Sequence, residues 1–471
     1  MAVAERIPYI SKCKFMAGRQ CLLRQWLQIH KPELDETGTT DIMEQGSAVG
    51  VFARTAFAGG VLVESDNFDF DKAVAETTRL MADPKVLVLF EAAFRYENLR
   101  VRVDMLARMG EGWSIGVIPN KEADYLACEV KASNSVKPHQ IEDVSFQKYV
   151  LEKAGLDVRV VTVCHLNRDY VYPGGKIETS KLFKMEPVTP KSTEWVEAEL
   201  AKQLPVVGQP VPPVIGTGSH CKTPYECEFY SHCNPKKALI GEPVLNPKGL
   251  ARLKDLRFPL YILDFETITP AIPLYVGGKC WQAVPTQWSL HVLRKPNGVL
   301  EHYDFLHDSA TDPRLPFAES VLAALGDMGD MGSVVMYSPY ERSTMRRLAE
   351  QFPELTLRVK ALESRWWDLY GDAIKLCYDK DDFSGSLSIK NVVQVLTPEV
   401  RYDELEVRGG DVAAGLWRRL ITLPDGPEKD KIRRDLAAYC AVDTVAAYQV
   451  LRYLFGLLDT RFLETLPSAF S

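Results

Sequence analysis

Acidic residues in otherwise apolar strands are the side chains of this chain that could bind a metal ion. In LYILDFET, Asp264 and Glu266 stand two residues apart, so both side chains point to one face of a strand. Burying two acids together is costly unless a cation neutralises them. Downstream, Glu341 follows the strand VVMY, and Tyr439 and Asp443 lie four apart on one helix face. The pattern predicts a Mg²⁺ or Mn²⁺ site that activates water for hydrolysis.

A second set of acids stands earlier in the chain. Asp104 is the lone acid in VRVDMLA, and Glu129 and Lys131 share a strand face in CEVKA. The helix that follows carries Asp143 and Gln147 four residues apart. An E-x-K pair alone is a common solvent-facing pattern, but this ordered combination is much rarer. Two acids that hold a cation, with a lysine that neutralises phosphate charge, would again suit phosphodiester hydrolysis.

Three of the ten cysteines form one tight cluster, Cys221, Cys227 and Cys233. Three thiolates are one short of the four that a structural zinc or a [4Fe–4S] cluster usually takes. The missing ligand must come from elsewhere in the chain. For zinc, His220 and His232 are the nearest candidates.

Bulk properties leave the class of partner open. A chain of 471 residues with 46% hydrophobic and 25% charged residues predicts two or three globular domains. The N-terminus lacks the apolar stretch of an export signal, and no apolar run is long enough for a bilayer, so we expect a cytoplasmic protein with no membrane partner. The net charge of −7 does not exclude nucleic acid, because metal-binding carboxylates lower the sum.

Two seams rich in proline and glycine, at residues 205–221 and 246–259, divide the chain. We expect a first domain over 1–240 that includes the cysteine cluster, a linker over 241–258, and a second domain over 259–471. Periodicity in the first domain predicts helices at 71–81 and 140–156, and strands at 86–94, 99–107, 113–118, 125–132 and 157–166.

The second domain begins with a strand at 260–267. A hairpin around Pro296-Asn297-Gly298 is expected to join strands at 287–293 and 299–306. A strand at 334–338 and helices at 316–328, 343–352 and 430–458 complete the prediction. Both domains are therefore expected to be α/β.

The order Asp104, Glu129-x-Lys131 and a helix with Gln147 resembles the PD-(D/E)XK nuclease core in its RecB-like branch. That resemblance implies a restriction-endonuclease-like fold, with Glu91 as an additional upstream acid or an ordinary strand-end glutamate. Two features depart from the family. No histidine follows Gly50 in the early helix, and position 151 is leucine instead of tyrosine. A degenerate domain that only grips DNA is therefore an alternative.

The N-terminal stretch SKCKFMAGRQCLLRQWL (11–27) resembles the first helix of RecB-like iron–sulfur nucleases. In those families one cysteine before the nuclease core and three after it share a [4Fe–4S] cluster. Cys21 matches that first position best, and Cys13 is the fallback. The resemblance thus implies a cluster held by Cys21, Cys221, Cys227 and Cys233 that ties the ends of the domain together.

The later motifs resemble DnaQ-like 3′→5′ exonucleases of the tyrosine variant, whose fold is RNase H-like with a DEDD site. The resemblance implies that Asp264, Glu266, Glu341 and Asp443 hold two divalent cations, and that Tyr439 orients the attacking water. Glutamate at 341 replaces the family's aspartate, and Ser338 replaces its asparagine. Asp368 in RWWDL is an alternative to Glu341.

Three further stretches, AIPLYVGGKCWQAVPTQWSLH (271–291), GSLSIKNVVQVLTP (385–398) and YDELEVRG (402–409), resemble one uncharacterised bacterial family that joins these two kinds of domain. This resemblance covers nearly the whole chain. The expected function is hydrolysis of nucleic acid, DNA before RNA, with repair or antiviral defence as the setting. An RNA-processing exonuclease and a nucleic-acid-binding protein with an inactive iron–sulfur scaffold are the alternatives. No G-x4-G-K-[ST] motif occurs, so a helicase partner would be a separate chain. The side chains expected along the nucleic-acid path are Gln287, Trp288, Ser386 and Lys390. The alternatives are that Trp288 is a core aromatic of its strand and that Lys390 is a surface lysine at a helix start.

Overall fold

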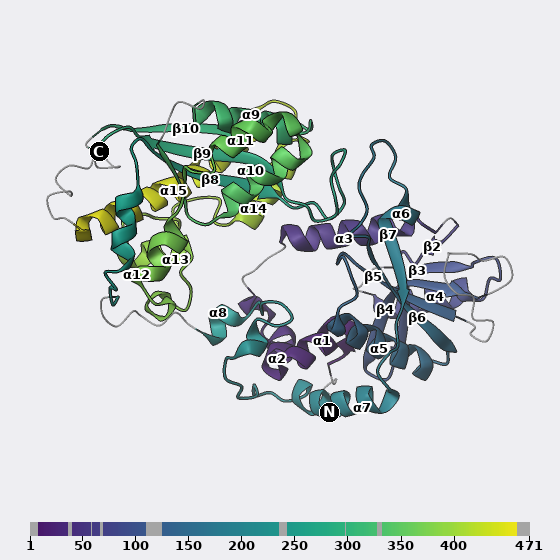
Figure 1. Cartoon of the computed structure of the whole chain (residues 1–471). Coiled ribbons are helices and arrows are strands. Elements are labelled where there is room, and N and C mark those ends of the chain that lie inside the picture. The colour runs from purple at the N-terminus through teal and green to yellow at the C-terminus, as the bar shows by residue number, and fades with distance from the viewer. Residues whose placement is uncertain are drawn as a thin grey trace. The chain divides into compact units, whose positions relative to one another are not determined.

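The computed structural model describes residues 8–35, 40–57, 59–65, 69–109, 125–234, 243–296, 298–326 and 332–458. The chain forms two compact units, each with its own sheet (Figure 1). Unit 1 comprises Met1–Pro235 and Ala271–Trp281, and unit 2 comprises Lys236–Pro270 and Gln282–Ser471. Both units combine helices with a mixed sheet, so the expected α/β class is confirmed.

Unit 1 is built on a mixed sheet with the strand order β2-β3-β4-β5-β6-β7, and β1 pairs with β4. β5 and β6 are parallel because helix α5 carries the chain between them, whereas β3, β4 and β5 are antiparallel neighbours. The strand expected at 113–118 lies outside the described residues. The strands are β1 (Ile10–Ser11), β2 (Val61–Leu62), β3 (Val88–Tyr96), β4 (Leu99–Arg108), β5 (Tyr125–Lys131), β6 (Val158–Leu166) and β7 (Phe183–Pro187).

Helices cover both faces of this sheet. α1, α4, α5 and α7 pack on one face through an apolar core that includes Phe15 and Phe146, and α3 packs on the other through Val49 and Ala53. The expected seam at 205 is wrong in one detail, because Pro205 lies within the last turn of α7. The helices are α1 (Lys12–Gln20), α2 (Leu22–His30), η1 (Pro32–Leu34), α3 (Asp41–Arg54), α4 (Phe70–Met81), α5 (Pro138–Lys153), α6 (Thr179–Leu182), α7 (Thr193–Val207), η2 (Ser219–Cys221) and α8 (Tyr230–Cys233).

A short segment from the second half of the chain, Ala271–Trp281, belongs to unit 1. The Ala271 N–H donates to Gln45 Oε1 at 2.6 Å, and the Trp281 indole N–H donates to the carbonyl oxygen of Ala132. Cys280 is buried in the same apolar cluster as helix α3. The boundaries expected from sequence assigned this segment to the second domain.

Unit 2 is built on a sheet with the order β10-β9-β8-β11-β12. β10, β9 and β8 are antiparallel, and β11 and β12 run parallel to β8. The expected hairpin is confirmed as β9 and β10, although Asn297 at its turn lies outside the described residues. The strands are β8 (Leu260–Ile268), β9 (Val284–Leu293), β10 (Leu300–Leu306), β11 (Ser333–Met336) and β12 (Trp366–Asp368).

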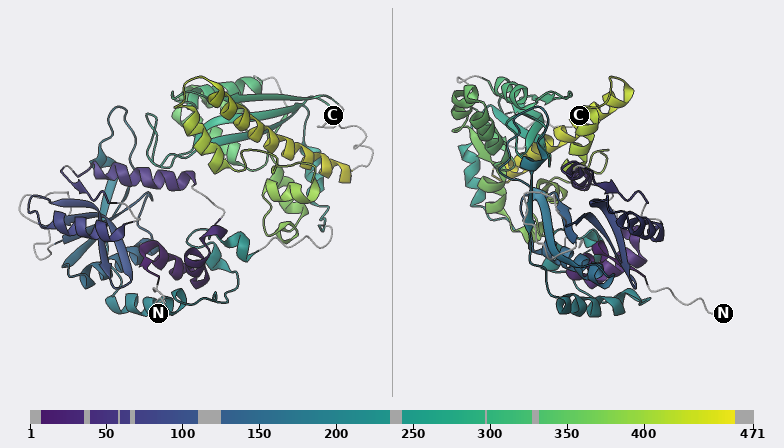
Figure 2. Two further views of the ribbon diagram at one scale, coloured as in Figure 1. Left: turned by 180° about the vertical axis from the view of Figure 1, so that it is seen from behind. Right: turned by 90° about the vertical axis from the view of Figure 1, so that its right-hand side faces the viewer.

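The alternation of β8 directs its side chains to two different cores. Tyr261 and Leu263 pack with α9 and α10, whereas Leu260 and Ile262 pack with α13 and the long helix α15. Figure 2 shows α15, at the yellow end of the colour scale, crossing that second face of the sheet. Asp264 and Glu266 continue the even-numbered row of β8, so they point toward α15.

The other helices of unit 2 complete its two outer layers. Residues 249–255, inside the expected linker, form the short helix η3, whose Leu250 and Leu253 are buried in the core. The helices are η3 (Gly249–Asp255), α9 (Arg314–Ala324), α10 (Tyr340–Gln351), η4 (Pro353–Leu355), α11 (Thr356–Ala361), η5 (Tyr370–Ile374), α12 (Lys375–Cys377), η6 (Lys380–Phe383), α13 (Ile389–Leu396), α14 (Gly410–Leu420) and α15 (Pro427–Leu458).

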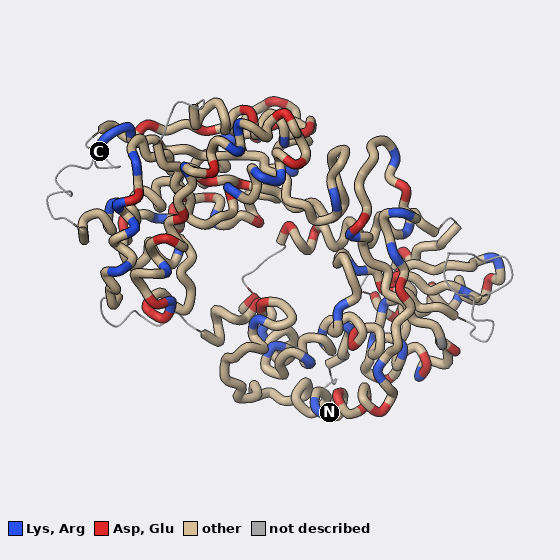
Figure 3. The backbone as a smooth tube through the Cα atoms, in the orientation of Figure 1, with Lys and Arg blue, Asp and Glu red and all other residues tan. Residues whose placement is uncertain are grey.

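Charge and hydropathy are distributed as follows in the part of the chain that the structure describes. Lys and Arg are interspersed with Asp and Glu in both units (Figure 3), although the net charge is negative. Among the described residues, no helix combines the length and the apolar character needed to cross a membrane.

Candidate functional site

Three carboxylates from distant parts of unit 2 meet between β8 and α15. One oxygen each from Asp264, Glu266 and Asp443 can be chosen so that all lie within 4.8 Å of one another. All three side chains are only partly exposed. The two-residue spacing on β8 sets the first pair, and the packing of α15 on β8 brings the third. The set offers hard oxygen ligands, which Mg²⁺ and Mn²⁺ prefer.

Polar contacts from β9 fix the rotation and height of α15. Gln287 Nε2 donates to the carbonyl oxygen of Leu436 at 2.9 Å, and the hydroxyls of Ser289 and Thr444 lie 2.9 Å apart. Because Thr444 follows Asp443 directly, this contact positions the acid. The side chains of Gln287 and Trp288 are buried in unit 2, which agrees with the alternative that Trp288 is a core aromatic of its strand.

Two tyrosines and a lysine surround the carboxylates. The Tyr402 hydroxyl donates to Asp443 Oδ1 at 2.6 Å. Lys390 Nζ donates to the Tyr439 oxygen at 3.2 Å and lies over the rings of both Tyr402 and Tyr439. The ammonium of Lys390 also lowers the pKa of Glu266, although burial and Asp443 outweigh it. Lys390 thus lies beside the acids themselves. Tyr402 was not identified as a site residue from sequence.

Glu341 stands slightly apart from the three-acid group. Its side chain is buried, accepts a hydrogen bond from the Phe265 backbone, and leaves Oε2 without a hydrogen-bond partner among the described residues. Asp368 neighbours Glu341 and accepts from the Gly371 N–H at 2.9 Å. This buried oxygen without a hydrogen-bond partner is available as a ligand for a cation.

Burial and mutual repulsion dominate the electrostatics of this group. Burial, followed by Asp443, raises the pKa of Glu266 to about 8, and burial raises the pKa of Glu341 to about 8. Burial, then Asp443 and Glu341, raises the pKa of Asp264 well above its usual range. Buried acids that repel one another in this way are stabilised by a divalent counter-ion. The residues therefore fit a metal site.

We expect the stabilisation by metal to grow with pH. An acid whose pKa is raised by folding contributes stability that is present below its unfolded pKa, near 4.3 for glutamate, and lost as pH rises through the folded pKa, about 8 for Glu266. A bound cation offsets that loss. The rise in Tm on adding Mn²⁺ should be at least about twice as large at about pH 8.5 as at about pH 5.5. Thermal unfolding with Mn²⁺ or EDTA measures it, and an equal rise in the Asp443→Asn chain would contradict it.

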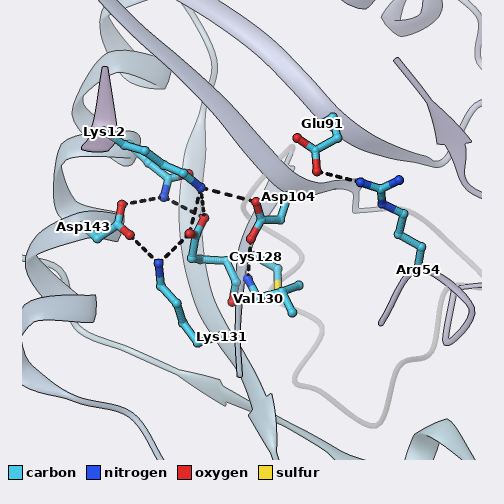
Figure 4. A network of polar contacts seen from close by, with 10 residues as sticks. Lys12, Arg54, Glu91, Asp104, Cys128, Val130, Lys131 and Asp143 are labelled. Atoms are coloured by element: carbon cyan, nitrogen blue, oxygen red, sulfur yellow. Dashed lines mark hydrogen bonds and ion pairs between the residues drawn. The ribbon is translucent and has the colours of Figure 1, made fainter. Parts of the chain in front are cut away.

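The acids predicted in unit 1 also converge, from the middle of β4, the end of β5 and helix α5 (Figure 4). Lys131 Nζ lies 2.8 Å from Glu129 Oε1 and 2.6 Å from Asp143 Oδ2. Gln147 Nε2 donates to Glu129 at 2.8 Å and to Asp143 at 2.9 Å. Asp104 Oδ2 accepts from the Val130 N–H at 2.7 Å. The spacing of the motif therefore predicts the local geometry well.

The spacing of the motif did not predict one residue of this centre. Lys12, the first residue of α1, lies within 3.3 Å of Asp104 and 2.8 Å of Glu129. Although burial opposes it, Lys12 followed by Lys131 holds the pKa of Glu129 well below its usual range. Burial, then Glu129, raises the pKa of Asp104 to about 7. Glu91 does not join the network and instead forms an ion pair with Arg54 at 2.8 Å.

The four cysteines predicted as cluster ligands line one pocket in unit 1, and His220 lines it with them. These cysteines are Cys21, Cys221, Cys227 and Cys233. Cys21 ends α1 and begins α2, whereas Cys13 lies beside the Lys12 centre. His232 is not among the described residues that line this pocket. The structure therefore brings Cys21, and not Cys13, to the other three cysteines.

A metal ion or cluster held by these residues would take its cysteines as thiolates. Burial raises the pKa of the Cys227 thiol to about 11, so binding requires its deprotonation.

Comparisons with known proteins are sparse. Residues 261–388 match the family model described as a domain of unknown function (DUF2779). The match begins in β8 and ends just before α13, so it includes Asp264, Glu266 and Glu341 but not Asp443. A comparison with curated proteins finds no match.

Proposed function

We propose that this protein is a metal-dependent nuclease whose hydrolytic centre is formed by Asp264, Glu266 and Asp443. The observation that carries the proposal is their convergence within 4.8 Å from β8 and α15, in partly buried positions. Gathering acids from segments about 180 residues apart in partly buried positions is costly, and a shared cation would offset that cost.

The fold of unit 2 supports a DnaQ-like assignment. Its sheet has three antiparallel strands followed by two parallel ones, and helices cover both faces. That arrangement is the one expected of an RNase H-like domain. The D-x-E pair stands on the central strand, and the Tyr439-x3-Asp443 pair stands on the last helix, as in the tyrosine variant of the exonucleases.

The side chains around the acids have separable roles in the proposed hydrolysis. Asp264, Glu266 and Asp443 would hold Mg²⁺ or Mn²⁺, which when bound neutralises charge and lowers the pKa of water. Tyr439 presents its hydroxyl beside the acids, where it can orient a water. Lys390 holds that hydroxyl at 3.2 Å and adds a positive charge for the phosphate. Tyr402 holds Asp443 in place through its hydrogen bond.

For unit 1 we propose a restriction-endonuclease-like fold of the RecB-like branch with a [4Fe–4S] cluster. Convergence of Asp104, Glu129, Lys131 and Gln147 from two strands and a helix supports the fold assignment. The shared pocket of Cys21 and the three later cysteines supports the cluster. The cluster would join the two ends of the unit and so restrict its unfolded state.

The proposed substrate is single-stranded nucleic acid, with DNA favoured over RNA, in a cytoplasmic setting of repair or antiviral defence with a separate helicase or defence partner. The second candidate is a nucleic-acid-binding protein whose first unit is an inactive iron–sulfur scaffold. The ion pairs of Lys12 with Asp104 and Glu129 favour that view of unit 1.

The test of the proposed function uses the unaltered chain with single strands of DNA and RNA labelled at either end. With Mg²⁺ or Mn²⁺, we expect stepwise shortening of the strand from its 3′ end and no activity in EDTA. Internal cleavage, or shortening that EDTA leaves unchanged, would contradict the proposal. The ratio of the DNA rate to the RNA rate identifies the preferred polymer.

A further inference from the structure

The ammonium of Lys12 sits between the two carboxylates expected to hold a cation in unit 1 (Figure 4). Its distances are 3.3 Å to Asp104 Oδ1, 2.8 Å to Glu129 Oε1 and 2.9 Å to Glu129 Oε2. A lysine has three N–H donors, and these three oxygens can receive all of them. Asp104 also accepts from the Val130 N–H through Oδ2, and Glu129 Oε2 also accepts from Gln147 Nε2.

The backbone on both sides of Lys12 is held independently of these ion pairs. Before it, β1 pairs with β4 in the register of Ile10 with Leu99. After it, Phe15 is fully buried and stacks on Phe146 of α5 with the ring centroids 4.4 Å apart. The sheet and the core therefore fix the backbone of Lys12 next to the two acids, independently of the ion pairs that its side chain forms.

We propose that Lys12 takes the place of a divalent cation in unit 1 and closes this centre to Mg²⁺ and Mn²⁺. The carboxylates of Asp104, Glu129 and Asp143 contribute three negative charges, and Lys12 and Lys131 contribute two positive charges, which leaves a formal charge of −1. A divalent cation would have to expel Lys12 from a largely desolvated network. This inference concerns unit 1 and stands apart from the hydrolytic centre proposed in unit 2.

The direct test measures Mn²⁺ binding to the full chain with the unit 2 acids removed by Asp264→Asn and Asp443→Asn. By electron paramagnetic resonance titration, this parent should bind no Mn²⁺ tightly, whereas addition of Lys12→Met should create one site at least roughly tenfold tighter than any in the parent. Lys14→Met is the matched control, because the Lys14 ammonium lies on the same helix but over the Tyr9 ring. Equal binding by the parent and the Lys12→Met chain, at any affinity, overturns the proposal.

A second measurement needs no substitution and so remains decisive if Lys12→Met does not fold. Amine acylation of the native chain, followed by mass spectrometry, should leave Lys12 unmodified both in EDTA and in excess Mg²⁺ or Mn²⁺, while Lys14 reacts. Acylation of Lys12 that begins on addition of Mn²⁺ would show that the cation displaces it, and would overturn the proposal.

Discussion

Replacing Asp264 by asparagine is expected to slow nucleotide release from a labelled 3′ end by about 10³-fold with Mg²⁺ or Mn²⁺. The substitution preserves shape but removes one of the charges that the cation needs. Its neighbours Glu266 and Asp443 cannot compensate, because both are already committed to the same group. Single-turnover assays with saturating enzyme isolate the hydrolytic step from binding of the strand.

Stability should change in the opposite direction from activity. Burial and then Asp443 raise the pKa of Asp264, so the metal-free chain must either bury a repelled charge or hold a proton on this acid, and asparagine removes both costs. In EDTA, the Asp264→Asn chain should have a Tm equal to or above that of the parent. Glu350→Gln, at an exposed acid of α10, is the matched control and should change neither property. Intact trimming in Asp264→Asn, combined with its loss in Glu129→Ala, would place the hydrolytic centre in unit 1.

Replacing Cys227 by serine is expected to remove iron from the protein and to lower its Tm by about 10–20 °C. Cys227 is a buried member of the cysteine pocket, and a cluster that includes Cys21 closes a loop of about 200 residues. Cross-linking a loop of that size stabilises a fold by about 5 kcal/mol, and each kcal/mol shifts Tm by about 2–4 °C in a domain of this length.

Anaerobic purification, visible absorbance and analysis of iron and sulfide measure the cluster in the parent and the variant. Cys13→Ser is the control, since Cys13 is exposed and does not line the pocket among the described residues, and this chain should keep its iron. Stoichiometric zinc without iron in the parent would instead assign the site to zinc, with His220 as the available histidine.

Local periodicity in the sequence was sufficient to predict helices and strands, and to predict which two side chains within one element share a face. The two-residue repeat of a strand puts Asp264 and Glu266 on one face, and the four-residue spacing of a helix aligns Tyr439 with Asp443, or Asp143 with Gln147. These relations hold wherever the element packs. For the same reason, the strands and helices that periodicity predicted lie close to their expected bounds wherever the structure describes them.

The tertiary structure alone decided which elements meet. Lys12 contacts acids that lie 92 and 117 residues away, and Tyr402 reaches Asp443 across 41 residues, distances that no periodicity encodes. Trp288 has the same local pattern in a core strand as on a binding surface, and only packing against the neighbouring layers buries it. The sequence by itself determined which side chains share a face; the packing of the layers determined what each face touches, because such contacts depend on the global arrangement of the chain.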